Sequence, residues 1–181
     1  MDGARLKAPS MTAFQTPRLI VRPFLLEDLD ALAAIASDPA VMRFVGDGQA
    51  LDRAATAEWI VRSRQNVARH GYGTAAVLDR ERGALVGWAG VARPPEGGEE
   101  LIYGLSRAWQ GRGLGREILQ GLIAAARDRG ATSLRALIYP DNHASAAMLT
   151  RAGFTLADTA YEGEDDTHLY VLEIGSDGGD D

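Results

Sequence analysis

Apolar positions along the chain recur at two spacings, one typical of helices and one of strands. The helical spacing is clearest after Gly115, where Ile118, Leu119, Leu122, Ile123 and Ala126 fall on one face of a helix that ends at Gly130. The same spacing predicts helices over 27–37, 53–69 and 142–152. Short apolar runs bounded by turn residues predict strands over 18–24, 74–79, 85–91, 101–105, 133–139, 154–161 and 167–174. Strands and helices interspersed in this order predict an α/β fold with a mixed sheet.

The two ends of the chain lack this periodicity. Residues 1–14 are mixed in character and are predicted to form a flexible extension, and residues 175–181 form a Gly- and Asp-rich tail that we expect to be disordered. The sequence therefore predicts one domain over residues 15–174. Its 181 residues suffice for one substantial core.

Composition excludes several classes of function. The chain has no cysteine, which excludes disulfides, thiolate zinc sites and a cysteine nucleophile. Its three histidines show no spacing typical of metal ligands, so no metal is expected, and its net charge of −6 does not favour nucleic-acid binding. No apolar run is long enough to span a membrane and no signal sequence is recognisable, so a cytoplasmic protein without a membrane partner is predicted.

A glycine-rich turn over 110–115 joins the strand at 101–105 to the helix that follows. The first amides of a helix lack internal partners and lie at the positive end of its dipole, so such a turn favours an anion. A P-loop would end in Lys followed by Ser or Thr, whereas Arg116 and Glu117 follow here. The dinucleotide-binding spacing of glycines is also absent. The pattern Gln/Arg-x-x-Gly-x-Gly/Ala, by contrast, is met by Gln110, Gly113 and Gly115.

With this pattern the chain resembles the GCN5-related N-acetyltransferases, the GNAT superfamily. The resemblance extends over about residues 16–174 and includes the Glu-Leu-Ile-Tyr-Gly-Leu-Ser run at 100–106, Tyr-Pro-Asp-Asn-x-x-Ser at 139–145 and Arg-Ala-Gly-Phe at 151–154. The opening Thr-Pro-Arg-Leu-Ile-Val-Arg-Pro-Phe at 16–24, with Asp38-Pro39, resembles the branch of ribosomal-protein N-terminal acetyltransferases. A tight turn without a ligand is the competing interpretation of the glycines taken alone.

The resemblance implies a GNAT fold and a cosubstrate. The fold would be a central twisted, mostly antiparallel sheet of six to seven strands, flanked by about four helices, with a V-shaped splay between the fourth and fifth strands. Acetyl-CoA would lie in that V without a metal ion. Pantetheine would pair with the strand edge at Tyr103, Leu105 and Ser106, and Asn142 would hold the pantetheine or thiol side. The diphosphate would lie on Gln110, Gly111, Arg112, Gly113, Leu114, Gly115 and Arg116.

Acetyl transfer to an amine needs a neutral amine and a proton for the leaving thiolate. An α-amine with a pKa near ~8 is roughly a tenth neutral at pH 7, so it demands less of a base than a lysine does. By the resemblance, Glu100 is the candidate base, acting through water, with the adjacent Glu99 as an alternative. Many family members carry a tyrosine that acts as the general acid at the position of Leu149. Its absence here makes Ser145 the candidate acid by the resemblance, with Tyr139 a weaker candidate. Asn142 and Ser145 could instead serve only as helix caps.

The acceptor is the least determined part of the prediction. The resemblance favours the N-terminal α-amine of a protein or peptide. A small amine such as an aminoglycoside, a polyamine or an amino-acid-like metabolite is the alternative, and the acidic stretch 162–166 would attract such a cation. A non-catalytic module that binds acyl-CoA is a third possibility, and a monomer or homodimer is expected in each case. The aromatic candidates for the acceptor wall are Phe44, Trp59, Tyr72, Trp88 and Trp109.

Overall fold

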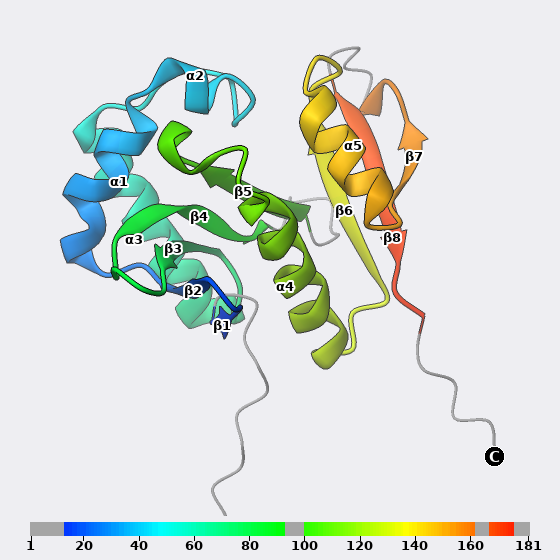
Figure 1. The fold of residues 1–181 in the computed structure, drawn as a ribbon, viewed down its shortest axis with the longest axis horizontal. Coiled ribbons are helices and arrows are strands. Elements are labelled where there is room, and N and C mark those ends of the chain that lie inside the picture. The colour runs from blue at the N-terminus through cyan, green and yellow to red at the C-terminus, as the bar shows by residue number, and fades with distance from the viewer. Residues whose placement is uncertain (1–12, 93–99, 162–166, 176–181) are drawn as a thin grey trace, which may run out of the picture.

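The structure is a computed structural model that describes residues 13–92, 100–161 and 167–175 (Figure 1). Its strands are β1 Phe14–Gln15, β2 Leu19–Pro23, β3 Thr74–Asp79, β4 Leu85–Ala92, β5 Glu100–Leu105, β6 Ser133–Ile138, β7 Thr155–Asp158 and β8 His168–Glu173. Its α-helices are α1 Leu29–Ala36, α2 Pro39–Met42, α3 Arg53–His70, α4 Leu114–Asp128 and α5 His143–Arg151. Two short 3-10 helices, η1 Leu26–Asp28 and η2 Arg107–Trp109, complete the described elements.

One sheet runs through the described residues in the order β1-β2-β3-β4-β5-β6-β8-β7. Every neighbouring pair is antiparallel except β5 and β6, which are parallel. These two strands pair only at Glu100 and Arg135 and then diverge, as Figure 1 shows between β5 and β6. The predicted mixed fold with a splay is therefore confirmed. The sheet has eight strands and the described chain has five α-helices, one strand and one helix more than the upper numbers expected.

The additional strand is β1, which begins at Phe14, a residue predicted to lie in the flexible extension. Phe14 pairs with Val21 of β2, and its ring packs so closely on α4 that a Cβ atom at Gly121 would lie 2.2 Å from it. A strand of two residues is too short to show the alternation of apolar and polar residues by which strands are predicted. The sequence therefore predicted wrongly that Phe14 belongs to the flexible extension.

The additional helix is α2. The sequence predicts a helix that ends at residue 37 and none directly after it, yet the Asp38 side chain accepts a hydrogen bond from the Ala40 amide at 2.9 Å. Proline fits the first turn of a helix because its missing N–H would have no partner there. Asp38 is thus the N-cap of α2, a helix of four residues that reaches the site described below.

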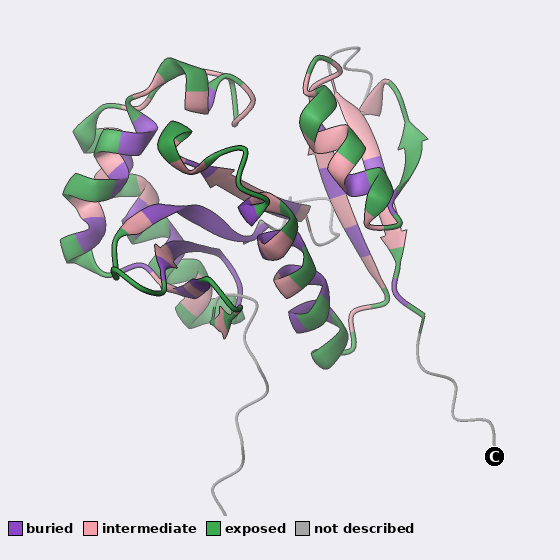
Figure 2. Ribbon diagram, in the orientation of Figure 1, coloured by how far each residue is buried: buried purple, intermediate pink, exposed green. Residues whose placement is uncertain are grey.

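Two hydrophobic clusters cover the two faces of the sheet. Alternate residues of β3 separate them, because Ala75 and Val77 belong to one cluster and Ala76 to the other. The five apolar positions predicted for α4 are at most 7% exposed and pack in the first cluster, so its predicted inner face is confirmed (Figure 2). The second cluster lies under α1 and α3 and centres on Trp88, which is fully buried.

The close packing around Trp88 depends on a glycine of β5. Gly104 lies opposite Trp88 in the β4–β5 pair, and a Cβ atom at this glycine would lie 2.2 Å from the indole ring. This packing fixes β5 against β4 beyond the point where β6 turns away. The side of β5 that faces the splay is thereby held by a rigid neighbour.

Neither a membrane-spanning helix nor a metal site occurs within the described residues. No helix there is both long enough and apolar enough to cross a bilayer. No group of three or more His, Asp or Glu side chains in the same residues is placed to hold a metal ion.

Candidate active site

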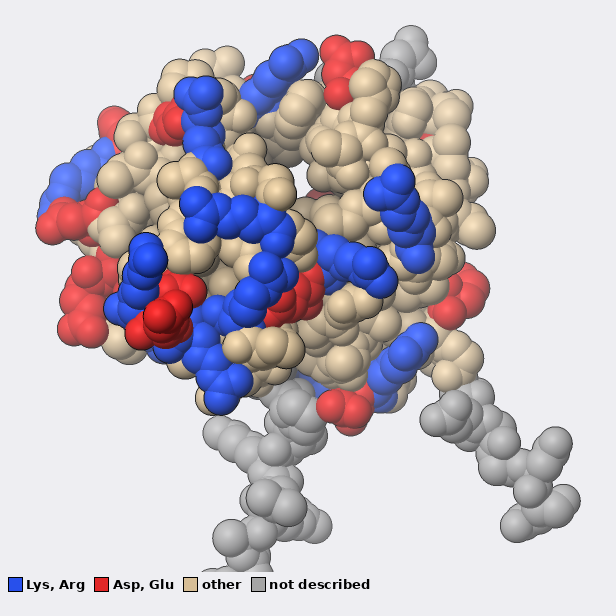
Figure 3. Space-filling view, viewed as in Figure 1, with Lys and Arg blue, Asp and Glu red and all other residues tan. Residues whose placement is uncertain are grey.

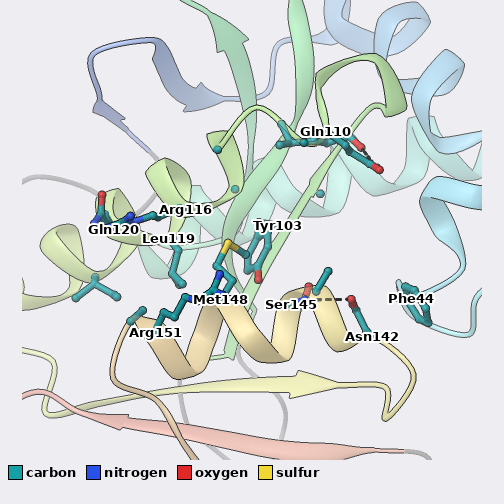
Figure 4. A pocket seen from close by; sticks show the side chains of 18 of the residues that line it. Phe44, Tyr103, Gln110, Arg116, Leu119, Gln120, Asn142, Ser145, Met148 and Arg151 are labelled. Carbon is teal, nitrogen blue, oxygen red and sulfur yellow. Dashed lines mark hydrogen bonds between the residues drawn. The ribbon is translucent and has the colours of Figure 1, made fainter.

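A cleft of about 950 Å³ opens where β5 and β6 separate. Its walls come from the α2 segment, the end of β5, the glycine turn, one side of α4 and the exposed side of α5. The space-filling view shows the surface hollowed at this place (Figure 3). Figure 4 shows side chains from these elements converging on it, with Tyr103 and Met148 extending toward each other from β5 and α5.

The glycine turn forms one end of this cleft. Gly111 and Gly113 have φ angles of +71° and +75°, in the left-handed region where a Cβ atom is disfavoured. Gly113 is the N-cap of α4, and no side chain caps this helix. The first amides of a 15-residue helix are therefore available to an anion in the cleft, which Gly113, Gly115 and Arg116 line.

The N-terminal segment holds this turn from behind. Arg18 donates from Nε to Glu117 Oε2 at 2.7 Å and from Nη1 to the Arg112 carbonyl at 2.9 Å. Its backbone amide and the Thr16 hydroxyl both donate to Glu117 Oε1. Burial alone would raise the pKa of Glu117, but these hydrogen bonds outweigh it and lower the pKa. Thr16 and Arg18 belong to the run at 16–24 that resembles the family, yet no local pattern in the sequence indicated that they support the glycine turn.

The free edge of β5 faces the splay beyond its pairing with β6. The Ser106 amide donates to the Val86 carbonyl of β4 at 2.9 Å, and backbone groups alternate between the two edges of a strand. The backbone groups of Tyr103 and Leu105 therefore face the cleft. The side chain of Gln110 donates to the Leu105 carbonyl at 2.9 Å, so it fixes the turn to the strand end. This contact gives Gln110 a structural role in addition to the predicted contact with a phosphate.

Helix α5 supplies the opposite wall with Asn142, Ser145 and Met148. The Asn142 side chain accepts a hydrogen bond from the Ser145 amide at 3.3 Å and caps the helix (Figure 4). The capping interpretation and the exposure of both side chains to the cleft are thus compatible. Leu149 points the other way and is fully buried in the core, so the position where many family members have a tyrosine cannot reach the cleft.

Glu100 lies apart from this cleft, at the closed end of the V. It is opposite Arg135 of β6 and Ala92 of β4. Burial raises the pKa of its carboxyl group, and the positive charge of Arg135 partly opposes the rise. A raised pKa suits a base that works near neutral pH. Glu99, the alternative base, lies outside the described residues.

The far end of the cleft is apolar and is formed by α2 and the residues after it. Ala40, Val41, Phe44 and Val45 line it. Of the five aromatic residues considered from the sequence, Phe44 is the one that lines the cleft; Trp88 and Trp59 pack on each other in the core with ring centroids 5.2 Å apart.

This apolar end is tied across the splay to the end of β6. The hydroxyl of Tyr139 donates to the Gly46 carbonyl at 2.6 Å, and its ring lies 6.1 Å from that of Phe44. The proton of the Tyr139 hydroxyl is thus engaged with a backbone carbonyl, which weakens its candidacy as the acid.

The charged side chains that line the cleft within the described residues are all arginines. Arg116 and Arg127 project from α4, and Arg151 projects from the end of α5. No described Asp or Glu lines the cleft. A groove with this charge and an uncapped helix N-terminus suits a ligand that carries several phosphates.

Not all residues proposed from the sequence line this cleft. Tyr103, Leu105, Gln110, Gly111, Gly113, Gly115, Arg116, Asn142 and Ser145 do. The side chain of Leu114 is buried in the core, so only its backbone could meet a ligand. Arg112 lies over the ring of Trp109 at 5.0 Å, and Ser106 accepts the Trp109 amide at the end of β5. Arg127 and Met148 line the cleft although no motif marked them, and so does Arg151, which begins the Arg-Ala-Gly-Phe motif but was not proposed as a site residue.

A family profile described as an acetyltransferase (GNAT) domain matches residues 18–155. The chain belongs to the GNAT acetyltransferases. The resemblance found in the glycine turn and in the Asn-x-x-Ser helix is thereby confirmed, and so is the prediction of an N-acetyltransferase. The splay between β5 and β6 is thus the one expected of this family.

Two sequence relatives and one solved structure are similar to this GNAT domain. The chain is 31% identical to L-2,4-diaminobutyric acid acetyltransferase of Streptomyces coelicolor over 144 residues, which are 77% of this chain and 76% of that protein. It is 39% identical to the N-alpha-acetyltransferase RimI of Mycobacterium tuberculosis over 79 residues, 41% of this chain and 48% of that one. RimL, a ribosomal-protein α-N-acetyltransferase solved in complex with coenzyme A, shares the fold with a TM-score of 0.75 at 22% identity, over 88% of this chain and 96% of that one.

Proposed function

We propose that this protein transfers the acetyl group of acetyl-CoA directly to the N-terminal α-amine of a protein or peptide. The observation that carries this proposal is the contrast between the two ends of the cleft. One end presents helix amides and arginines, and the other is apolar without any described carboxylate. The first end suits the phosphates of coenzyme A. The second suits an acceptor whose reacting amine is its one cationic group.

The cofactor-binding role rests on fixed backbone groups. The Gln110–Gly113 turn and the first turn of α4 would hold the diphosphate, and Arg116 would add a positive charge beside it. The backbone of Tyr103 and the Leu105 amide would pair with the pantetheine amides along the free edge of β5. When bound, acetyl-CoA supplies a thioester carbonyl to the amine and a thiolate that leaves.

Two side chains would move the protons. The amine gains its bond to the acetyl carbon as the carbon–sulfur bond breaks, so one proton leaves nitrogen and one proton reaches sulfur. Glu100 would take the first proton, because its raised pKa makes it a stronger base. It would act through water, since its carboxyl group lies outside the cleft. Ser145, which lines the cleft, would give the second. A thiolate with a pKa near ~8.5 leaves readily, so loss of this acid should cost less than loss of cofactor position.

A small diamino acid is the second candidate acceptor. It is favoured by the similarity to a diaminobutyric acid acetyltransferase, which extends over three quarters of the chain. Such an acceptor carries a further ammonium group, which needs an anionic partner near the site. The acidic stretch 162–166 that could supply it lies outside the described residues.

An acceptor panel with thiol detection tests both candidates. The chain contains no cysteine, so a thiol reagent reports only released coenzyme A. We expect turnover with peptides bearing a free N-terminus and none with the same peptides after N-terminal blocking. Faster turnover with diaminobutyrate than with any peptide would select the second candidate. Tight binding of acetyl-CoA with no turnover on any amine would instead support a non-catalytic acyl-CoA-binding module.

A further inference from the structure

Tyr103 carries a buried hydroxyl that the mechanism above leaves unused. This tyrosine lies on β5 and lines the cleft, yet its hydroxyl oxygen is shielded from solvent. The oxygen makes no hydrogen bond of full geometry to any described residue. A buried hydroxyl without a partner destabilises the fold, so its persistence at a candidate active site calls for an explanation.

The neighbour that this hydroxyl faces is Ser145. Figure 4 shows the Tyr103 ring extending from β5 across the splay toward α5, where Ser145 and Met148 lie. Burial raises the pKa of the Tyr103 phenol, and the adjacent Ser145 hydroxyl opposes part of the rise. The phenol is therefore protonated at neutral pH and can act as a donor.

We propose that Tyr103 is a positioning residue for Ser145. The phenol donates its hydrogen bond to the Ser145 oxygen, and the Ser145 proton is thereby directed into the cleft toward the sulfur of coenzyme A. Because hydroxyl groups in series polarise one another, the Ser145 proton also becomes a better donor. Tyr103 keeps its own proton throughout, so one proton passes from Ser145 to sulfur and solvent restores it.

This arrangement follows from the architecture of the splay. Tyr103 is on the last strand before the sheet separates, and Ser145 is one turn into the helix on the other side. The Asn142 cap fixes the first turn of α5, and the packing of Gly104 on Trp88 fixes β5.

A double-mutant cycle in steady-state kinetics tests the pair, and it rests on the proposed transfer to an amine. Tyr103→Phe removes only the hydroxyl, and we expect kcat to fall roughly tenfold while the KM for acetyl-CoA changes less than twofold. Ser145→Ala should lower kcat by at least as much. The double variant should be no slower than Ser145→Ala, because Tyr103 acts only through Ser145. If the double variant instead lost kcat by the product of the two single-variant factors, the two residues would act independently and the proposal would be overturned.

A second measurement needs no turnover. With coenzyme A bound, the pH dependence of its alkylation by iodoacetamide gives the pKa of the bound thiol, and the chain offers no cysteine to interfere. Ser145→Ala should raise this pKa by about one unit, since it removes the hydrogen bond that favours the thiolate. Tyr103→Phe should raise it by a smaller amount, since it only weakens that hydrogen bond. The double variant should raise it no further than Ser145→Ala does. Arg116, Arg127 and Arg151, the charged described side chains of the cleft, are present in every variant.

Tyr170→Phe is the matched control, because Tyr170 is a buried tyrosine of β8 that does not line the cleft. It should leave kcat and the pKa of the bound thiol at their wild-type values. A Tyr103→Phe variant that behaves like this control refutes the positioning role while the acetyltransferase proposal stands. If the wild type showed no turnover but the variants still shifted the pKa of the bound thiol as expected, the proposed function would be refuted while the interaction between Tyr103 and Ser145 would stand.

Discussion

Arg18 and Glu117 are 99 positions apart in the chain, and their side chains meet at 2.7 Å behind the glycine turn. The same guanidinium reaches the Arg112 carbonyl within the turn. A loop with two glycines in left-handed conformations has little stiffness of its own. The contact with Arg18 thus holds the amides in place, and fixed amides bind an anion without the entropic cost of ordering a loop.

Arg18→Ala should therefore weaken the binding of coenzyme A more than it weakens the fold. The Arg18 side chain is 51% exposed, and ion pairs at such sites contribute about 0–1 kcal/mol to stability. We expect the dissociation constant for coenzyme A, measured by calorimetry, to rise about tenfold with a small change in the melting temperature. Arg53→Ala breaks a comparable 2.8 Å ion pair with Asp30 that does not line the cleft, and should leave this affinity unchanged. Equal effects of the two substitutions would contradict the supporting role of Arg18.

Glu117 gives this contact a pH dependence with a definite sign. Its pKa in the folded protein lies below the ordinary 4.5, because hydrogen bonds from Thr16 and Arg18 outweigh the opposing effect of burial. A lowered carboxyl pKa stabilises the fold above the ordinary pKa, and the gain is lost as the pH falls through the folded value. Thermal melts between pH 7 and 3 should show the wild type more stable than Glu117→Gln near pH 6, with the difference shrinking on acidification. A difference in stability that does not change with pH would show that Glu117 stabilises the fold through its packing and not through its charge.

Local patterns in the sequence predicted much of this site, and long-range contacts account for what they missed. The inner face of α4 and the Gly113 turn depend on residues within a few positions of one another. The Arg18–Glu117 contact and the approach of Tyr103 to Ser145 depend on how distant segments pack, which no local spacing records. Gln110 shows both cases, because its motif was recognised while its bond to the Leu105 carbonyl was not.

Gly113→Val should abolish binding of coenzyme A while the core remains folded. A valine is strained at the φ of +75° found here, so the turn must change shape, yet no buried apolar contact is lost. Gly115→Ala is the matched comparison, because Gly115 has no positive φ and an added Cβ would meet only the flexible end of Met148, at 3.3 Å from Sδ. Calorimetry should show affinity within a few fold of wild type for Gly115→Ala and no detectable binding for Gly113→Val. Wild-type affinity in both would refute the phosphate-binding role of the turn.

The pH–rate profile identifies the base. If Glu100 accepts the proton, kcat/KM falls on acidification through its pKa, which burial raises above the ordinary 4.5. Arg135→Gln removes the charge that opposes this rise, so the acid limb should move to higher pH. Glu100→Gln should remove the limb and lower kcat about a hundredfold. The acceptor amine adds its own limb near pH ~8, which is identified by titrating the peptide alone. A second, more acidic limb that survives in Glu100→Gln would assign the proton transfer to another titrating group such as Glu99.

Phe44 provides a test of which end of the cleft receives the acceptor. The residues after α2 are held across the splay by the bond from Tyr139 to the Gly46 carbonyl, and Phe44 lines the cleft beside Val41 and Val45. Phe44→Ala widens this apolar end without touching the glycine turn, so the KM for a peptide acceptor should rise about tenfold while the affinity for coenzyme A stays constant. Leu26→Ala, at a residue that is 66% exposed and does not line the cleft, should change neither value. A fall in coenzyme A affinity with an unchanged acceptor KM would assign the apolar end to the cofactor, and the acceptor would then have to approach from the Glu100 side of the splay.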